Sequence, residues 1–244
     1  MFKRWDLISS SSSYDVTWNG EFIPKDEKQE KQAGIIWEQA LRKRPDSFVN
    51  GLIYTFESAN VSGDKTVIHG RRARYFYYYA QHVDPSLDFG LVPVGVSGII
   101  EVPHGNGKAL VAAKRGSDVT QYSGFYEFVP SGGIDEASMH ENGQVDYTGQ
   151  LRKELNEETG VGENEIESIR PFAFIRDIEG GVFDICSVIT LNSNPFSKGK
   201  TSVASNEYSE FVVIPYEEAP QFLKKNKNKV VPTSLAMFQA LNKK

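Results

Sequence analysis

The chain has 244 residues, of which 39% are apolar and 12% aromatic, and its formal net charge is −5. This composition is sufficient for a packed core and excludes a disordered chain. The negative charge argues against a nucleic-acid-binding protein and against one drawn to an anionic membrane surface, so we expect neither kind of partner.

The only cysteine is Cys186, which excludes an internal disulfide and a cysteine-based zinc cluster. It lies in the apolar run 182–189, where a buried apolar role is expected. The amino-terminal residues lack the apolar segment of a secretory signal, and no stretch approaches the roughly 18 apolar residues of a membrane span. We therefore expect a cytoplasmic protein.

The first 90 residues predict an irregular α+β segment. Residues 25–44 are charged with spaced apolar side chains, which predicts an amphipathic helix ended by Pro45. Residues 52–56 and 66–69 are predicted strands, separated by a turn at 62–64.

The elements predicted after residue 90 alternate irregularly between strands and helices. Pro130-Ser131-Gly132-Gly133 follows a short strand, and Gly160 suits the carboxyl-terminal cap of a helix. The predicted strands are 93–102, 109–113, 126–129, 169–178, 182–191 and 210–214, and the predicted helices are 147–159, 216–224 and 232–241.

This order lacks a regular βαβ repeat, so it predicts an α/β fold with a mixed sheet flanked by helices. We expect three parts. An amino-terminal α+β extension covers 1–90, the main α/β/α sandwich covers 91–225, and a carboxy-terminal helix in 226–244 packs on the sandwich.

The helix predicted at 147–159 carries Glu154, Glu157 and Glu158, which fall within an arc of roughly 100° around its axis. Three carboxylates this close repel one another unless a positive charge lies between them. A hard divalent cation, Mg²⁺ or Mn²⁺, suits such oxygen ligands and keeps positions for water and phosphate. The alternative is an ordinary acidic surface helix.

The surrounding residues favour the metal. Lys153 to Val161 resembles the second half of the Nudix box, with Lys153 where the family has arginine. Val129 to Gly133 resembles the strand and glycine pair that precede the box. The resemblance implies the Nudix α/β/α fold and a pyrophosphohydrolase that cleaves a nucleoside diphosphate linked to another group.

The first half of the box departs from the family pattern. The stretch from Gly133 to Lys153 is about six residues longer, and Val145 stands where the pattern has glutamate, with Asp146 or Glu141 as nearby substitutes. Lysine lacks the planar fork of arginine, so Lys153 is expected to brace the helix through Glu157.

The resemblance also implies roles for particular residues. Glu157 and Glu158 would be the principal metal ligands, and Glu154 would bind a metal or orient water. A carbonyl of Gly132 or Gly133 would complete the ligand set, Gly133 also lying against substrate. The general base would be a box glutamate, Glu207 or Glu210, and Arg115 would contact phosphate. The remaining catalytic candidate is Lys153.

The amino-terminal half bears on the substrate. Trp37 to Gly51, followed by the tyrosine-rich stretch 75–79, is loosely similar to Nudix proteins that hydrolyse UDP-sugars. We therefore expect a nucleotide-sugar, with ADP-ribose or dinucleotide polyphosphates as alternatives. We expect the tyrosines either to stack on the base or sugar of the substrate or to pack the extension against the main sheet. A non-catalytic nucleotide sensor and a purely structural acidic domain are the alternatives of other classes, and the sequence leaves the oligomeric state open.

Overall fold

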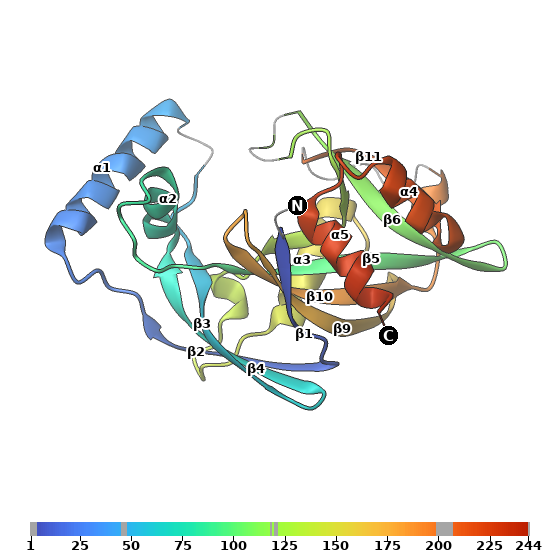
Figure 1. Cartoon of the computed structure of the whole chain (residues 1–244), viewed down its shortest axis with the longest axis horizontal. Coiled ribbons are helices and arrows are strands. Elements are labelled where there is room, and N and C mark those ends of the chain that lie inside the picture. Colours follow the sequence, from blue (N-terminus) through green and yellow to red (C-terminus); the bar gives the residue numbers. More distant parts are fainter. Residues whose placement is uncertain (1–3, 45–47, 118, 120–121, 199–206, 244) are drawn as a thin grey trace.

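The computed structural model describes residues 4–44, 48–117, 119, 122–198 and 207–243. Its main feature is a large mixed sheet, visible on the right of Figure 1. The strand order is β1-β9-β10-β5-β6-β11, with short β7 on β6 and β8 on β5. All pairs are antiparallel except β10 with β5. The α/β class expected from the sequence is confirmed.

Except for β1 and β8, which were not predicted, the strands of this sheet match the predicted segments to within a few residues at either end. They are β1 (Trp5–Ser9), β5 (Val94–His104), β6 (Gly107–Arg115), β7 (Tyr126–Phe128), β8 (Ser131–Gly133), β9 (Ile166–Asp177), β10 (Val182–Leu191) and β11 (Tyr208–Pro215).

Helices cover both faces of the sheet. On one face α3 (Tyr147–Thr159) packs on β5 and β8, and its Leu151 and Leu155 join a core with Val96 and Ile100. On the other face α5 (Pro232–Leu241) packs on β9 and β1, within a second core that includes Ile99. Successive side chains of β5 thus point to opposite layers, as strand geometry requires. The short α4 (Ala219–Lys225) lies beside β11.

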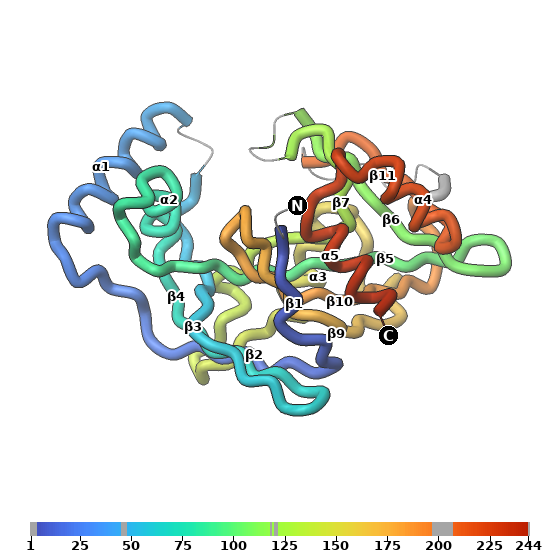
Figure 2. The backbone as a smooth tube through the Cα atoms, viewed as in Figure 1, coloured from blue at the N-terminus to red at the C-terminus, as the bar shows by residue number. Residues whose placement is uncertain are grey.

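A second, three-stranded sheet is formed by β2 (Ser13–Glu21), β4 (Lys65–Arg74) and β3 (Leu52–Ser62), in that order. Two helices, α1 (Glu27–Lys43) and α2 (Tyr75–Val83), accompany it at the left of Figure 2. The predicted helix at 25–44 and the turn at 62–64 are confirmed, whereas β1, β2, β8 and α2 were not predicted.

The tyrosine-rich stretch forms α2, and most of its rings pack within the protein. Tyr77 is buried against Phe22 and Phe89. Tyr75 and Tyr79 lie edge-on to Trp37 of α1. These contacts give Tyr75, Tyr77 and Tyr79 a structural role. Tyr78 differs, because it lines a cavity.

The small sheet is joined to the large one through the long loop before α3. The Trp18 backbone N–H donates to the Gly143 carbonyl (2.8 Å), and the Val145 N–H donates to the Val16 carbonyl (2.9 Å). Tyr54 N–H donates to the Ile134 carbonyl (3.0 Å). The residues that lengthen this loop are therefore held by β2 and β3.

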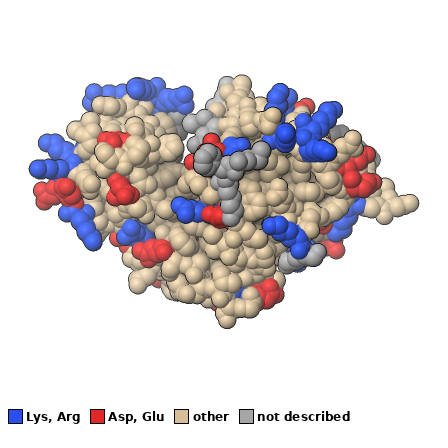
Figure 3. Space-filling view, in the orientation of Figure 1, with Lys and Arg blue, Asp and Glu red and all other residues tan. Residues whose placement is uncertain are grey.

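Charged side chains are interspersed over the surface, with a concentration of lysine and arginine along α1 at the upper left of Figure 3. Cys186 is fully buried in the large sheet, as expected. None of the described helices combines the length and the apolar character that a membrane crossing needs.

One hydrophobic core spans both sheets, because Tyr14, Tyr54 and Ile68 of the small sheet cluster with Val94 and Leu151. The division at residue 90 remains a prediction. This shared core leads us to expect one cooperative unfolding transition.

Truncating Tyr54, which is fully buried, should test this. We expect Tyr54→Ala to lower the free energy of unfolding by about 3–5 kcal/mol and to keep a single transition. Val61→Ala, at an exposed position of the same strand, should change it by less than about 0.5 kcal/mol. Denaturant unfolding followed by tryptophan fluorescence and by circular dichroism checks this, and two separate transitions would contradict the shared core.

Candidate functional site

Helix α3 has defined ends that fix its direction on the sheet. Asp146 caps the amino terminus, accepting a hydrogen bond from the Gly149 N–H at 2.7 Å. Gly160 ends the helix in the left-handed conformation (φ 71°), which confirms it as the predicted cap. Leu151 and Leu155 face the sheet, so Glu158, on the same side, is carried into the interior.

Glu158 lies against the edge strand β8 and is only 3% exposed. Its Oε1 accepts a hydrogen bond from the Ser131 backbone N–H at 3.2 Å. Its Oε2 is buried and has no hydrogen-bond partner among the described residues. Burial raises the pKa of this carboxyl to about 9, although the Ser131 N–H opposes the rise. An ionised Glu158 therefore requires a positive partner.

Glu154 lies beside Gly132, the central residue of β8. A Cβ added to Gly132 would be 2.2 Å from the Glu154 carboxyl carbon, so any other residue there would displace the Glu154 carboxylate. Gln150 donates to Glu154 Oε1 at 2.6 Å and is itself fixed by a hydrogen bond from the Ser138 hydroxyl (2.8 Å). Burial raises the pKa of Glu154. The sequence analysis missed Gln150, one helical turn before Glu154.

Glu157 has a different environment. Its side chain is 57% exposed, and its Oε1 is 4.0 Å from the Lys153 Nζ. The helix places the three carboxylates on neighbouring positions as predicted, but only Glu154 and Glu158 contact β8. Among the described residues, no three His, Cys, Asp or Glu side chains converge on one point that would hold a metal.

Lys153 makes its shorter contact elsewhere. Its Nζ donates to Asp135 Oδ2 at 2.5 Å, and this hydrogen bond raises the pKa of Lys153. Asp135 lies two residues after the end of β8, so the pair ties α3 to the start of the long loop. The expected pair with Glu157 is present but longer. Of the nearby substitutes, Asp146 caps α3 and Glu141 is exposed in a turn.

A second buried carboxylate, Glu127, borders the same region. It accepts hydrogen bonds from Arg115, from the Tyr208 hydroxyl (3.3 Å) and from the Ser131 hydroxyl (3.4 Å). Burial raises the pKa of Glu127, and Arg115 opposes that rise. Arg115, expected to contact phosphate, thus has a carboxylate partner within the protein. Glu127 was not singled out in the sequence, where it is one residue of the short strand predicted at 126–129.

The two later candidates for a base differ in position. Glu210 is half-exposed on β11 and lies 3.7 Å from Lys114. Glu207 is nearer to the box, because its charge contributes to the raised pKa of Glu158 and of Glu127. Gly133 pairs with Gly95, and a Cβ there would meet no atom within 4 Å, so Gly133 borders open space.

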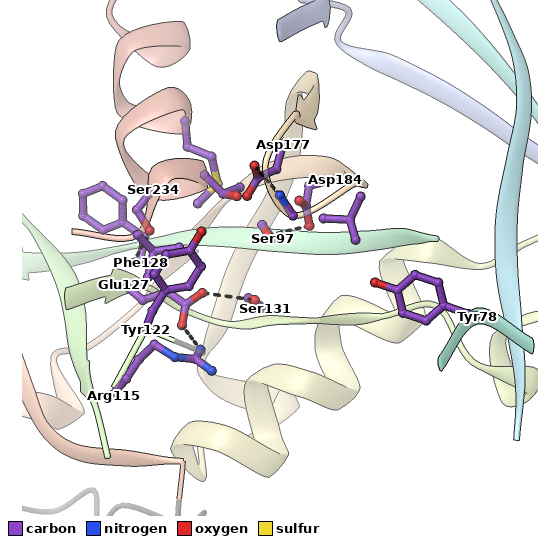
Figure 4. Close-up of a pocket in the computed structure, with 15 residues that line it drawn as sticks. Tyr78, Ser97, Arg115, Tyr122, Glu127, Phe128, Ser131, Asp177, Asp184 and Ser234 are labelled. Atoms are coloured by element: carbon purple, nitrogen blue, oxygen red, sulfur yellow. Dashed lines mark hydrogen bonds and ion pairs between the residues drawn. The ribbon is translucent and has the colours of Figure 1, made fainter. Parts of the chain in front are cut away.

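A cavity of about 220 Å³ opens beside β8, on the α5 side of the large sheet (Figure 4). One wall carries Ser131, Glu127 and Arg115, and the other carries Ser97 and Asp184. The lining also includes Asp177 of β9, Thr233 and Ser234 of α5, Tyr122, and Tyr78 of α2.

Gly95 lies between the cavity residue Asp184 and the backbone of β8. A Cβ added there would lie 2.7 Å from the Gly132 carbonyl oxygen and 3.0 Å from Asp184 Oδ1. The missing side chain therefore leaves both oxygens around one small space. Burial raises the pKa of Asp184 to about 7, opposed by the hydrogen bond from Ser97.

The donor set fits a hard divalent cation. It consists of carboxylate oxygens and a glycine carbonyl, which Mg²⁺ and Mn²⁺ prefer. The buried, unpartnered Oε2 of Glu158 lacks the positive charge that a cation would supply. Glu154, Glu158 and the Gly132 carbonyl would hold the ion, and Glu157 would join them by turning away from Lys153.

No protein-family model and no curated protein matches the sequence. Among solved structures, the NUDIX domain of Shewanella oneidensis NrtR complexed with ADP ribose is 18% identical, over 59% of this chain and 85% of its own, with a TM-score of 0.43.

Two further structures are similar at the same level. A C. elegans Ap4A hydrolase is 12% identical over 61% of this chain and 98% of its own, with a TM-score of 0.40. A bifunctional NMN adenylyltransferase/ADP ribose pyrophosphatase from Francisella tularensis is 12% identical over 68% of this chain and 45% of its own, with a TM-score of 0.48. At these identities and TM-scores the likeness carries no argument about this chain, and what the chain does has to be inferred from its own residues.

The Lys153–Asp135 pair generates a prediction about the rigidity of the site. Lys153→Met should weaken Mn²⁺ binding by about 10-fold, because the loop after β8 loses its tie to α3, whereas Lys153→Arg should retain it. Arg152→Met is the matched control, since Arg152 pairs with Glu163 instead. Electron paramagnetic resonance titration of Mn²⁺ measures the affinity. Unchanged affinity in Lys153→Met would make Lys153 a solvated charge.

Proposed function

We propose that this chain is a hydrolase that uses a divalent cation, Mg²⁺ or Mn²⁺, to cleave the phosphate–phosphate bond of a nucleoside diphosphate linked to another group. The observation that carries the proposal is the carboxylate of Glu158, buried against β8 with one oxygen unpartnered. The resemblance of Lys153 to Val161 to the Nudix box supports the same chemistry.

The residues of the chain would divide the work between them. Glu154, Glu157, Glu158 and the Gly132 carbonyl would hold the cation, which when bound would offset phosphate charge and lower the pKa of a water molecule. The Ser131 N–H would orient Glu158, and Gln150 would orient Glu154. Lys153 would keep α3 in register with the loop after β8 through Asp135.

A carboxylate near the reacting water would take its proton. Of the two candidates outside the box, Glu207 is favoured over Glu210, because Glu207 acts electrostatically on Glu158 while Glu210 lies beside Lys114. The expected products are two phosphorylated molecules.

The substrate we propose is a nucleotide-sugar, with ADP-ribose and dinucleotide polyphosphates as alternatives of the same class. The cavity beside β8 supports a substrate with a bulky group beyond the diphosphate, because its walls share Ser131 and Glu127 with the surroundings of the box. A screen of nucleoside diphosphate derivatives with Mg²⁺, read by chromatography of the products, identifies the substrate.

One observation favours a second function, a nucleotide sensor without turnover. Glu157 lies by Lys153, and the three box carboxylates do not converge among the described residues. A sensor would bind the same ligands and release no product in that screen.

Replacing the buried carboxylates tests the proposal. Glu158→Gln and Glu154→Gln should each lower kcat by at least about 100-fold with Mg²⁺, because the shape is kept while a charge that holds the cation is lost. Glu167→Gln, an exposed glutamate on β9, is the control and should retain activity. Steady-state kinetics on the substrate found by the screen, beside melting temperatures, gives the comparison. Near-normal turnover in both box variants would refute the metal assignment.

A further inference from the structure

Asp184 is a buried carboxylate that no part of the proposed chemistry uses. It is 8% exposed and lines the cavity from strand β10. Its Oδ1 accepts a hydrogen bond from the Ser97 hydroxyl at 3.0 Å (Figure 4). Its Oδ2 has no hydrogen-bond partner among the described residues. A carboxylate oxygen of a cavity-lining residue that lacks a protein partner is an acceptor that a ligand in the cavity can satisfy.

The surroundings of Asp184 define the chemistry of that ligand. Asp177, on the adjoining strand, uses Oδ1 to accept the backbone N–H groups of Glu179 and Gly180. The hydroxyls of Thr233 and Ser234 line the same cavity. The guanidinium at the cavity wall, that of Arg115, pairs with Glu127. Two carboxylates at one end disfavour phosphate and favour a group that donates hydrogen bonds.

The position of Asp184 relates this end of the cavity to the diphosphate site. The Gly132 carbonyl and Asp184 Oδ1 flank the space left by the missing side chain of Gly95. Ser97, the partner of Asp184, is also paired with Ser131 in the β5–β8 ladder. Because these two oxygens flank one space, a diphosphate bound through a cation at the Gly132 carbonyl would have its attached group close to Asp184.

We propose that Asp184, oriented by Ser97, determines specificity by accepting hydrogen bonds from the hydroxyls of a sugar attached to the diphosphate. This proposal rests on the proposed function, because it adds a sugar-binding residue beside the proposed diphosphate site. Acceptors distributed over several walls suit the hydroxyls of a non-planar ring. The rings of Tyr78, Tyr122 and Phe128 also line the cavity, so a nucleobase bound there is the competing outcome that the test below has to separate.

Binding of two matched ligands tests this proposal without turnover. The probes are UDP-glucose and the methyl ester of UDP, each with a methylene group between the phosphorus atoms so that it resists hydrolysis. They share the nucleoside and the diphosphate and differ in the sugar. Isothermal titration calorimetry with Mg²⁺ gives Kd for each, and the readout is the ratio of the two values.

Asp184→Asn should reduce the preference for the sugar-bearing ligand by about 10- to 100-fold and leave Kd for the methyl ester nearly unchanged. Ser97→Ala, which keeps the carboxylate and removes its orienting donor, should reduce the preference by about 3- to 10-fold. Glu101→Gln is the matched control, because Glu101 is equally buried but lies at the other end of β5 beside Lys108.

An equal loss for both ligands would place the nucleoside in the cavity and overturn the proposal, as would a wild-type protein without preference for the sugar-bearing ligand. Melting temperatures identify a variant that fails to fold, in which case Ser97→Ala decides the matter. Failure of the proposed function is distinguishable, since it appears as binding with sugar preference and no product from hydrolysable UDP-glucose.

Discussion

The burial of Glu158 is the constraint on which the rest of the site depends. Burying an ionised carboxylate that is 3% exposed and has one unpartnered oxygen is unfavourable in free energy unless a cation lies beside it. Its position follows from packing, because Leu151 and Leu155 hold α3 on the sheet and carry Glu158 inward with them. The glycine at position 132 then leaves room for Glu154 beside it. Hydrophobic packing thus maintains an electrostatic arrangement that would not form by itself.

The long loop before α3 is the feature in which this chain departs most from the pattern it resembles, and the structure shows how the loop is held. Strands β2 and β3 bind its backbone through Val16, Trp18 and Tyr54. Lys153 binds Asp135, near the start of the loop. The amino-terminal segment therefore supports the helix that carries the carboxylates. This dependence explains why the two sheets share one core.

The sequence could predict features that depend on local periodicity, and not those that depend on distant pairing. The helix at 147–159, its glycine cap and the common side of Glu154, Glu157 and Glu158 follow from the helical repeat. The different directions of these side chains do not, because β8, Asp135 and Gln150 select them. Asp184 and Ser97 are 87 residues apart, and Glu127 acquires its role from Arg115 and Tyr208. Such partners become neighbours only through the order of strands, which composition and spacing do not encode.

The parallel pair of β5 and β10 has a consequence for how the chain is made. Its partners, such as Ser97 and Cys186, are far apart in sequence, and β1 pairs with β9 across a still longer stretch. During synthesis from the amino terminus, the centre of the large sheet has to wait for β10, and β1 waits as an unpaired edge until β9 emerges. Non-local pairing of this kind slows folding and exposes strand edges to other chains. Strand β5 therefore lacks its parallel partner until residue 191, the end of β10, has been synthesised.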